Sequence, residues 1–157
     1  PVYGGGQESG IRSGNQNTPG IAALSVAVNE AFDGLDRNYE LVSRLNLQLK
    51  NALSAMECVK INSPENSLPF ILSFSVCGVR SEILLHSLEA SGVYVSSGSA
   101  CSKGKKSGVL SAMGLSDERI DSAIRVSFSK YNTADDVDLL VKALNDALSH
   151  IKRKSCR

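Results

Sequence analysis

The sequence lacks long apolar runs, tryptophan and any large excess of one charge. A membrane-spanning helix needs about 20 consecutive apolar residues, and no stretch of the 157 residues approaches that length. No leader made of charged, apolar and small residues begins the chain. We therefore expect a cytoplasmic protein without a membrane partner.

Cysteine and histidine are scarce: the sequence has Cys58, Cys77, Cys101 and Cys156, together with His86 and His150. So few, irregularly spaced cysteines do not make a disulfide scaffold in a chain of this size, and no C-x-x-C pair indicates zinc or a redox dithiol. We expect reduced thiols, no metal site and two surface or half-buried histidines. Cys58 and Cys77 lie in or beside predicted strands and are expected to be packing residues.

Charge is nearly balanced, with 17 Lys and Arg against 16 Asp and Glu and a formal net charge of +1. Such a balance gives no electrostatic footprint for nucleic acid. The one basic cluster lies in residues 152–157, where a solvated tail is typical. We expect no direct contact with nucleic acid, and the 42% hydrophobic content is enough for a single core.

A helical pattern runs from residue 18 to residue 56. Its apolar residues recur at spacings of three and four: Ile21, Leu24, Val28, Ala31, Leu35, Val42, Leu45, Leu49, Ala52 and Met56. Thr18 is the expected N-cap and Pro19 the expected first helical residue. Gly34 costs about 1 kcal/mol in a helix interior relative to alanine, so the pattern fits one long helix or two in series.

Four segments are predicted strands: residues 59–61, 70–76, 93–95 and 124–128. In 70–76 and 124–128 apolar residues alternate with mostly polar ones, which is typical of strands buried on one face. One-sided strands favour an antiparallel sheet over a doubly wound parallel sheet, whose strands are apolar on both faces.

Shorter helices are predicted over 81–90, over 107–113, after Ser116, and from the Thr133 cap onward. The last helix has a buried stripe: Val137, Leu140, Val141, Leu144, Leu148 and Ile151. The chain is therefore expected to be an α+β domain, with helices packed on a small, mainly antiparallel sheet and a long N-terminal helix.

Cys101 is the first candidate for chemistry. It lies in a serine- and glycine-rich loop over 96–106 and is followed by Lys103, Lys105 and Lys106. Nearby ammonium groups and the helix that follows favour the thiolate, which is the nucleophilic form. The alternative is a solvated loop cysteine without a role.

Arg125 is the second candidate. It lies on the polar face of the predicted strand 124–128, together with Ser127 and Ser129. From such a surface a guanidinium can hold a carboxylate through two parallel hydrogen bonds. The alternative is a structural ion pair with an acidic residue.

The first 17 residues are rich in glycine and contain Arg12, Ser13 and Asn15. Free backbone amides in such a loop can hold an anion. The segment matches neither the P-loop nor the dinucleotide-binding fingerprint, so by itself it indicates no particular ligand.

Together these segments resemble the C-terminal part of the pyridoxal-phosphate-dependent cysteine desulfurases, which belong to the class V aminotransferase family. The matching stretches are residues 4–8 (GGGQE) with 12–14 (RSG), 96–101 (SSGSAC), 112–116 (AMGLS) and 124–129 (IRVSFS). Their order and separation also resemble the family, so the likeness covers nearly all 157 residues.

The resemblance implies the small C-terminal domain of a fold-type I pyridoxal-phosphate enzyme that converts L-cysteine to L-alanine. Cys101 matches the cysteine that takes the sulfur as a persulfide, and Arg125 matches the arginine that holds the substrate carboxylate. Asn15 stands where the family commonly has a threonine that reaches the cofactor phosphate of the opposite subunit. An asparagine amide can still donate a hydrogen bond there. The implied partners are a second copy of the chain and a sulfur-acceptor or iron–sulfur scaffold protein, for iron–sulfur cluster assembly or tRNA thiolation.

The family's Schiff-base lysine has no counterpart, because no lysine here stands in a Ser-His-Lys setting. The resemblance thus implies that residues 1–17 continue from a cofactor domain and that 18–157 form the C-terminal domain, with a mobile cysteine loop at 96–106. The chain alone is expected to be inactive. Two alternatives stay open: a related pyridoxal enzyme, such as a selenocysteine lyase or an aminotransferase-like protein, and a non-enzymatic sulfur-carrier or dimerisation module.

Overall fold

The computed structural model describes residues 2–97 and 107–151. In chain order its elements are η1 (Gln7–Gly10), α1 (Thr18–Asp33), α2 (Leu35–Ser54), β1 (Val59–Ile61), β2 (Ile71–Val76), α3 (Ser81–Ala90), β3 (Ser96–Ser97), α4 (Gly108–Ala112), α5 (Asp117–Asp121), β4 (Ala123–Ser127) and α6 (Ala134–His150). They fall into two compact units, residues 1–36 and 37–157. Every helix in the described part of the chain is too short or too polar to cross a membrane.

The first unit holds the glycine-rich segment and α1. Asn17 is the N-cap of α1, because its side-chain oxygen accepts a hydrogen bond from the amide of Gly20 at 3.1 Å. The sequence prediction placed this cap at Thr18, one residue too late. Thr18 and Pro19 instead occupy the first two helical positions, where the missing N–H of proline costs no hydrogen bond.

Gly34 separates α1 from α2, so the long helical pattern is two helices in series. The Gly34 amide donates to the carbonyl of Glu30 at 3.3 Å and closes α1, and α2 begins at Leu35. The compact units divide after Asp36, whereas the division expected from the sequence lies after Asn17. The helix α1 therefore groups with the glycine-rich segment.

The second unit is a two-layer α+β domain, as the sequence predicts. Its four strands are ordered β1-β2-β4-β3, and all three neighbouring pairs are antiparallel. The central pair is β2 with β4, the two strands whose alternation is clearest in the sequence. The prediction of a mainly antiparallel sheet is confirmed.

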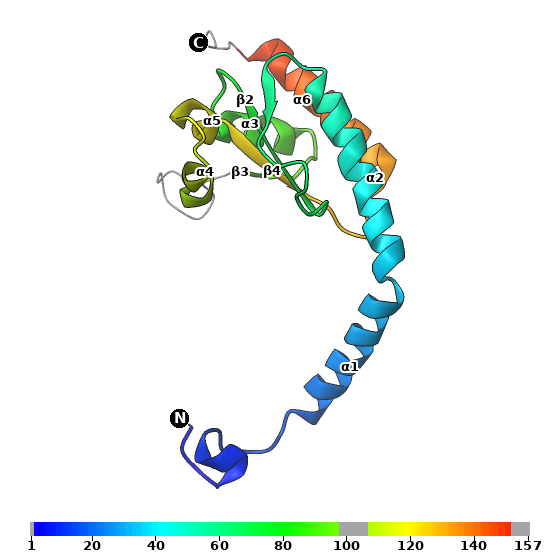
Figure 1. Ribbon diagram of the computed structural model, residues 1–157, viewed down its shortest axis with the longest axis vertical. Helices are drawn as coiled ribbons and strands as arrows, with labels where there is room; N and C mark the ends of the chain where they lie inside the picture. The colour runs from blue at the N-terminus through cyan, green and yellow to red at the C-terminus, as the bar shows by residue number, and fades with distance from the viewer. Residues whose placement is uncertain (1, 98–106, 152–157) are drawn as a thin grey trace. The chain divides into compact units, whose positions relative to one another are not determined.

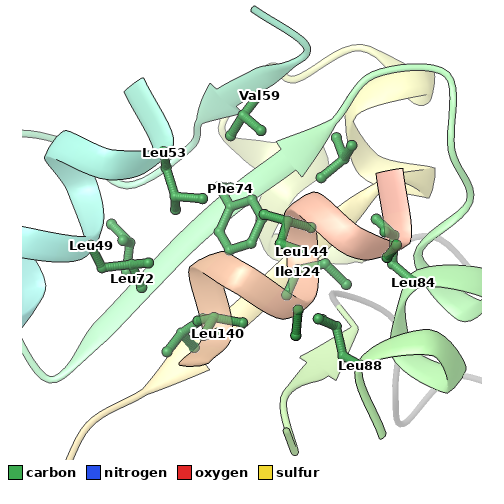
Figure 2. Close-up of a cluster of buried hydrophobic side chains, with 14 of the residues drawn as sticks. Leu49, Leu53, Val59, Leu72, Phe74, Leu84, Leu88, Ile124, Leu140 and Leu144 are labelled. Atoms are coloured by element: carbon green, nitrogen blue, oxygen red, sulfur yellow. The ribbon is translucent and has the colours of Figure 1, made fainter. Parts of the chain in front are cut away.

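One face of this sheet carries the main core. The core combines residues of α2, α3 and α6 with the inward residues of the strands, among them Leu72, Phe74 and Ile124. Figure 2 shows the ring of Phe74 in the middle of this cluster, between Leu53 and Leu144. The helices α2 and α6 run side by side (Figure 1), and Gln48 of α2 donates to the carboxylate of Asp138 at 2.9 Å.

Phe74 should be among the most sensitive positions of the fold, because its side chain has no exposed surface. Changing Phe74 to alanine should lower the free energy of unfolding by about 3–5 kcal/mol, through lost burial and the cavity left behind. Urea unfolding of both variants would measure this. The control is Leu139→Ala on α6, where the leucine is 46% exposed. An equally small effect of both changes would show that Phe74 is not central to the core.

A second, smaller cluster lies on the other face of the sheet. It consists of Leu110 of α4, Ile120 of α5 and Ala123 at the start of β4. Helix α5 begins after its N-cap Ser116, as the sequence predicts, whereas α4 begins one residue after the predicted start, because Ser107 is its N-cap. This cluster covers one end of that face.

The predicted strand over 93–95 is wrong. These residues do not pair, and β3 comprises Ser96–Ser97, which the sequence prediction assigned to the loop. The amide of Val93 bonds back to the carbonyl of Leu88 at 2.9 Å and so completes the end of α3. The chain therefore reaches β4 only at Ser96, whose Cα partner is Arg125.

Helix α6 begins after the predicted Thr133 cap, and this cap is reciprocal. The Thr133 hydroxyl accepts from the Asp136 amide, and the Asp136 carboxylate accepts from the Thr133 amide at 2.9 Å. This backbone hydrogen bond, helped by one from the Asn132 side chain, holds the pKa of Asp136 below its ordinary value. The buried stripe also includes Ala143 and Ala147, while the predicted Val141, Leu148 and Ile151 are only half-buried.

Candidate functional site

The sheet face opposite the main core is polar. Successive residues of a strand point to opposite faces, so the residues that alternate with the core share this second face. They are Lys60 of β1, Ile71, Ser73 and Ser75 of β2, Ser96 of β3, and Ala123, Arg125 and Ser127 of β4, and six of these eight are polar. Among the described residues, α4 and α5 cover the end of this face at Ser75, which is buried, whereas Arg125 and Ser127 are exposed and Ser73 and Ser96 are half-buried.

Arg125 lies in the middle of this face. Its Cα partners are Ser73 on β2 and Ser96 on β3. Side chains directly opposite each other in an antiparallel pair have Cβ atoms about 4.5–5.5 Å apart. The guanidinium therefore emerges between two serines, which are small enough to leave room for a bound group.

Arg125 is exposed and, within residues 2–97 and 107–151, makes no hydrogen bond or ion pair. The sequence left open a structural ion pair with an acidic residue, and no described residue makes one. A guanidinium without a protein partner on a polar surface has all five N–H donors available. Such a group can bind a carboxylate or a phosphate through two hydrogen bonds.

A second arginine lies near this face and was not expected from the sequence. Nη2 of Arg119 donates to the carbonyl of Ile61 at 2.9 Å and to Oδ1 of Asn62 at 2.6 Å. Nδ2 of Asn62 donates to the hydroxyls of Ser75 at 2.8 Å and Ser73 at 3.3 Å. The alternation of Ser73 and Ser75 with apolar residues was the signal for this cluster, but the sequence does not show that α5 delivers Arg119 to it.

The charged and hydroxyl groups of the glycine-rich segment serve its own structure. The Arg12 guanidinium donates to the carbonyls of Gly14 and Asn15 and to the side chain of Gln16. The Ser13 hydroxyl lies within hydrogen-bond distance of the carbonyls of residues 2 and 5, at 3.0 and 2.7 Å. Neither side chain is therefore free to take an anion without breaking the loop.

Asn15 is the exception in this segment. Its side chain is exposed and makes no hydrogen bond to any described residue, although its carbonyl accepts from Arg12 at 3.1 Å. The amide can therefore donate to a phosphate. The Asn15 side chain therefore fits a single contact to the phosphate of pyridoxal phosphate. The sequence does not supply the Schiff-base lysine for this cofactor, because no lysine stands in a Ser-His-Lys setting.

Cys101 lies outside the described residues, in the segment 98–106 that joins β3 to α4. Cys58 and Cys77 are half-buried free thiols, and Cys58 packs against the core, as expected of a packing residue. Both histidines are exposed, which confirms the surface positions predicted for them. The structure thus brings Arg125 and the serines of β2, β3 and β4 together on one sheet face.

Residues 4–140 match the aminotransferase class V family. A cysteine desulfurase IscS of Clostridium botulinum is 34% identical over 149 residues, which are 91% of this chain and 38% of that protein. A putative cysteine desulfurase, IscS 1 of Bacillus subtilis, is 36% identical over 155 residues, or 96% of this chain and 41% of that protein.

Solved structures agree with these relatives. A NifS-like protein superimposes with a TM-score of 0.81 and 36% identity, covering 96% of this chain and 38% of its own. A NifS-like protein from Rickettsia africae gives a TM-score of 0.79 and 29% identity, and the match covers 94% of this chain and 39% of the Rickettsia chain. The chain thus spans about two fifths of the length of the relatives that it matches. The family match covers most of the sequence, including Arg119 and Arg125, and the chain belongs to the aminotransferase class V family.

Proposed function

We propose that this chain is the C-terminal part of a cysteine desulfurase, which converts L-cysteine to L-alanine and keeps the sulfur as a persulfide on Cys101. The observation that carries the proposal is the exposed guanidinium of Arg125 on the polar sheet face, where no residue within 2–97 and 107–151 pairs with it. In this role Arg125 holds the carboxylate of L-cysteine. The proteins named cysteine desulfurase among the relatives support the reaction.

The chain connectivity supports a meeting of Cys101 with the substrate held by Arg125. Ser96 is the Cα partner of Arg125, and Ser97, at the end of β3, is only four residues before Cys101. A chain spans at most about 3.6 Å per residue. Cys101 is therefore tethered within roughly 14 Å of the strand that flanks Arg125.

The proposed reaction balances without an external oxidant. The thiolate of Cys101 attacks the sulfur of L-cysteine, so an S–S bond forms while the Cβ–S bond of the substrate breaks. The electron pair of the broken bond stays with carbon, which takes up a proton and leaves as alanine. Pyridoxal phosphate, when bound, supplies the electron sink at the α-carbon of the substrate.

Asn15 is proposed to contact the phosphate of that cofactor in the opposite subunit.

The exposed apolar residues of α1 support an assembly larger than these 157 residues. No residue of α1 is buried, and Ile21, Leu24, Val26 and Phe32 are between 58% and 73% exposed. We propose that the cofactor-binding part of the complete enzyme covers them, that residues 18–157 form its small domain, and that the enzyme is a homodimer.

The persulfide passes to a sulfur-acceptor or iron–sulfur scaffold protein in this proposal, and the enzyme works in the cytoplasm. The four irregularly spaced cysteines of the sequence do not make a disulfide framework, which supports a reducing compartment.

Mixing the complete enzyme with L-cysteine tests the proposal. We expect alanine in the product and one additional sulfur atom on the Cys101 peptide by mass spectrometry. The 157-residue chain alone should form no alanine, because it lacks the cofactor lysine. Alanine formation without sulfur on Cys101, or no alanine from the complete enzyme, would refute the proposal.

A further inference from the structure

In the hydrogen-bond network beside Arg125, each donor and acceptor can be assigned, starting from Arg119. A guanidinium can only donate, so its bond at 2.6 Å identifies the Asn62 atom that it contacts as the oxygen. The amide nitrogen of Asn62 must then face the two serines of β2. Asn62 is 7% exposed, so water has little access to compete for these bonds.

The two serines that accept from Asn62 use their protons differently. The Ser75 hydroxyl accepts from Asn62 at 2.8 Å and donates to the carbonyl of Arg119 at 2.6 Å. Its side chain is completely buried. Ser75 therefore closes a ring of hydrogen bonds that joins β2 to α5, and its hydroxyl has no capacity left to donate.

The Ser73 hydroxyl keeps its proton available. It accepts from Asn62 at 3.3 Å and donates to no group in the described part of the chain. Its backbone is held on both sides, because its amide donates to the Ser63 hydroxyl at 2.9 Å and its carbonyl accepts from the Asn62 amide at 2.8 Å. Ser73 is the Cα partner of Arg125 on the same sheet face.

We propose that Ser73 is a second donor to the carboxylate that Arg125 binds, and that Asn62 and Arg119 are positioning residues for its hydroxyl. The inference rests on the proposed function. A carboxylate has about four lone-pair sites, and the fork of Arg125 uses two. The bond from Asn62 occupies a lone pair of the Ser73 oxygen, so the hydroxyl proton points elsewhere and becomes a stronger donor.

The test uses Ser73→Ala in the complete enzyme, assayed with L-cysteine. We expect KM to rise by about tenfold to a hundredfold, since a hydrogen bond to a charged group is lost, while kcat changes much less. The thermal midpoint should stay near that of the unaltered enzyme, because the Ser73 hydroxyl is not part of the buried ring.

Ser75→Ala is the matched comparison, with the same residue type on the same strand and the same Asn62 partner. It should lower the thermal midpoint more than Ser73→Ala does and raise KM less. The inhibition constant of cysteamine, the cysteine analogue without a carboxylate, should be unaffected by Ser73→Ala. Arg119→Leu should also raise KM for L-cysteine, by a smaller factor than Ser73→Ala does.

Two results separate this inference from the function on which it rests. If Arg125→Ala raises KM and Ser73→Ala does not, Ser73 is no carboxylate donor and the proposed function stands. If Ser73→Ala raises the inhibition constant of cysteamine and the KM for L-cysteine by the same factor, the hydroxyl acts on something other than the carboxylate and the inference is wrong. Absence of alanine formation by the unaltered enzyme would overturn both.

Discussion

Replacing Cys101 with alanine in the complete enzyme should abolish the formation of alanine from L-cysteine. The substrate sulfur can leave carbon only if a nucleophile accepts it, and the alanine side chain has no lone pair to offer. Loss of a nucleophile typically lowers kcat by several orders of magnitude, so we expect a decrease of at least roughly a thousandfold. Substrate binding should remain, because Arg125 is unchanged. Quantifying alanine by chromatography, with L-cysteine in excess, measures the effect.

Cys77→Ala is the control for this change. Cys77 is a half-buried free thiol at the end of β2, and its amide bonds to the carbonyl of Cys58. The substitution leaves that backbone bond in place and removes one half-buried thiol, so alanine formation should stay within a factor of about two. Equal losses in the two variants would show that Cys101 has no special role.

Replacing Arg125 with alanine should lower kcat/KM for L-cysteine by about 10²- to 10⁴-fold. Two charge-assisted hydrogen bonds are lost, each worth about 1.5–3 kcal/mol, and about 1.4 kcal/mol corresponds to a factor of ten. The fold should tolerate the change, because Arg125 is exposed and has no partner among the described residues. Initial rates over a range of L-cysteine concentrations measure it, with far-UV circular dichroism to confirm folding.

Arg125→Lys separates charge from geometry in the same experiment. Lysine keeps the positive charge but cannot make two parallel hydrogen bonds to one carboxylate. We expect kcat/KM of this variant to lie between those of the alanine variant and the unaltered enzyme. Full activity of the alanine variant would mean that the substrate carboxylate binds elsewhere.

Local patterns predicted most of the secondary structure, because they depend on neighbouring residues. The alternation over 70–76 and 124–128 identified β2 and β4, and the Thr133 cap located the start of α6. Two details were missed for local reasons. Asn17 competes with Thr18 for the cap of α1, and residues 93–95 have strand-like side chains but no neighbouring strand to pair with.

The candidate site was only partly accessible from the sequence. Arg125 was found because its strand has an alternating polar face. Asn62 and Arg119 were missed, since 57 residues separate them and no spacing rule relates them. Their contact depends on α5 packing over the end of the sheet through Ile120.

By itself, the sequence determined the composition of the candidate site: one guanidinium on a one-sided strand, one cysteine in a polar loop, and an α+β domain to carry them. Those features follow from the side-chain alternation of a strand and the turn residues between elements. The tertiary structure alone decided which of the two β2 hydroxyls that accept from Asn62 stands opposite Arg125 with its proton available. That choice depends on antiparallel register, which pairs Ser73 with Arg125, and on a hydrogen-bond ring that uses the proton of Ser75 but leaves that of Ser73 free.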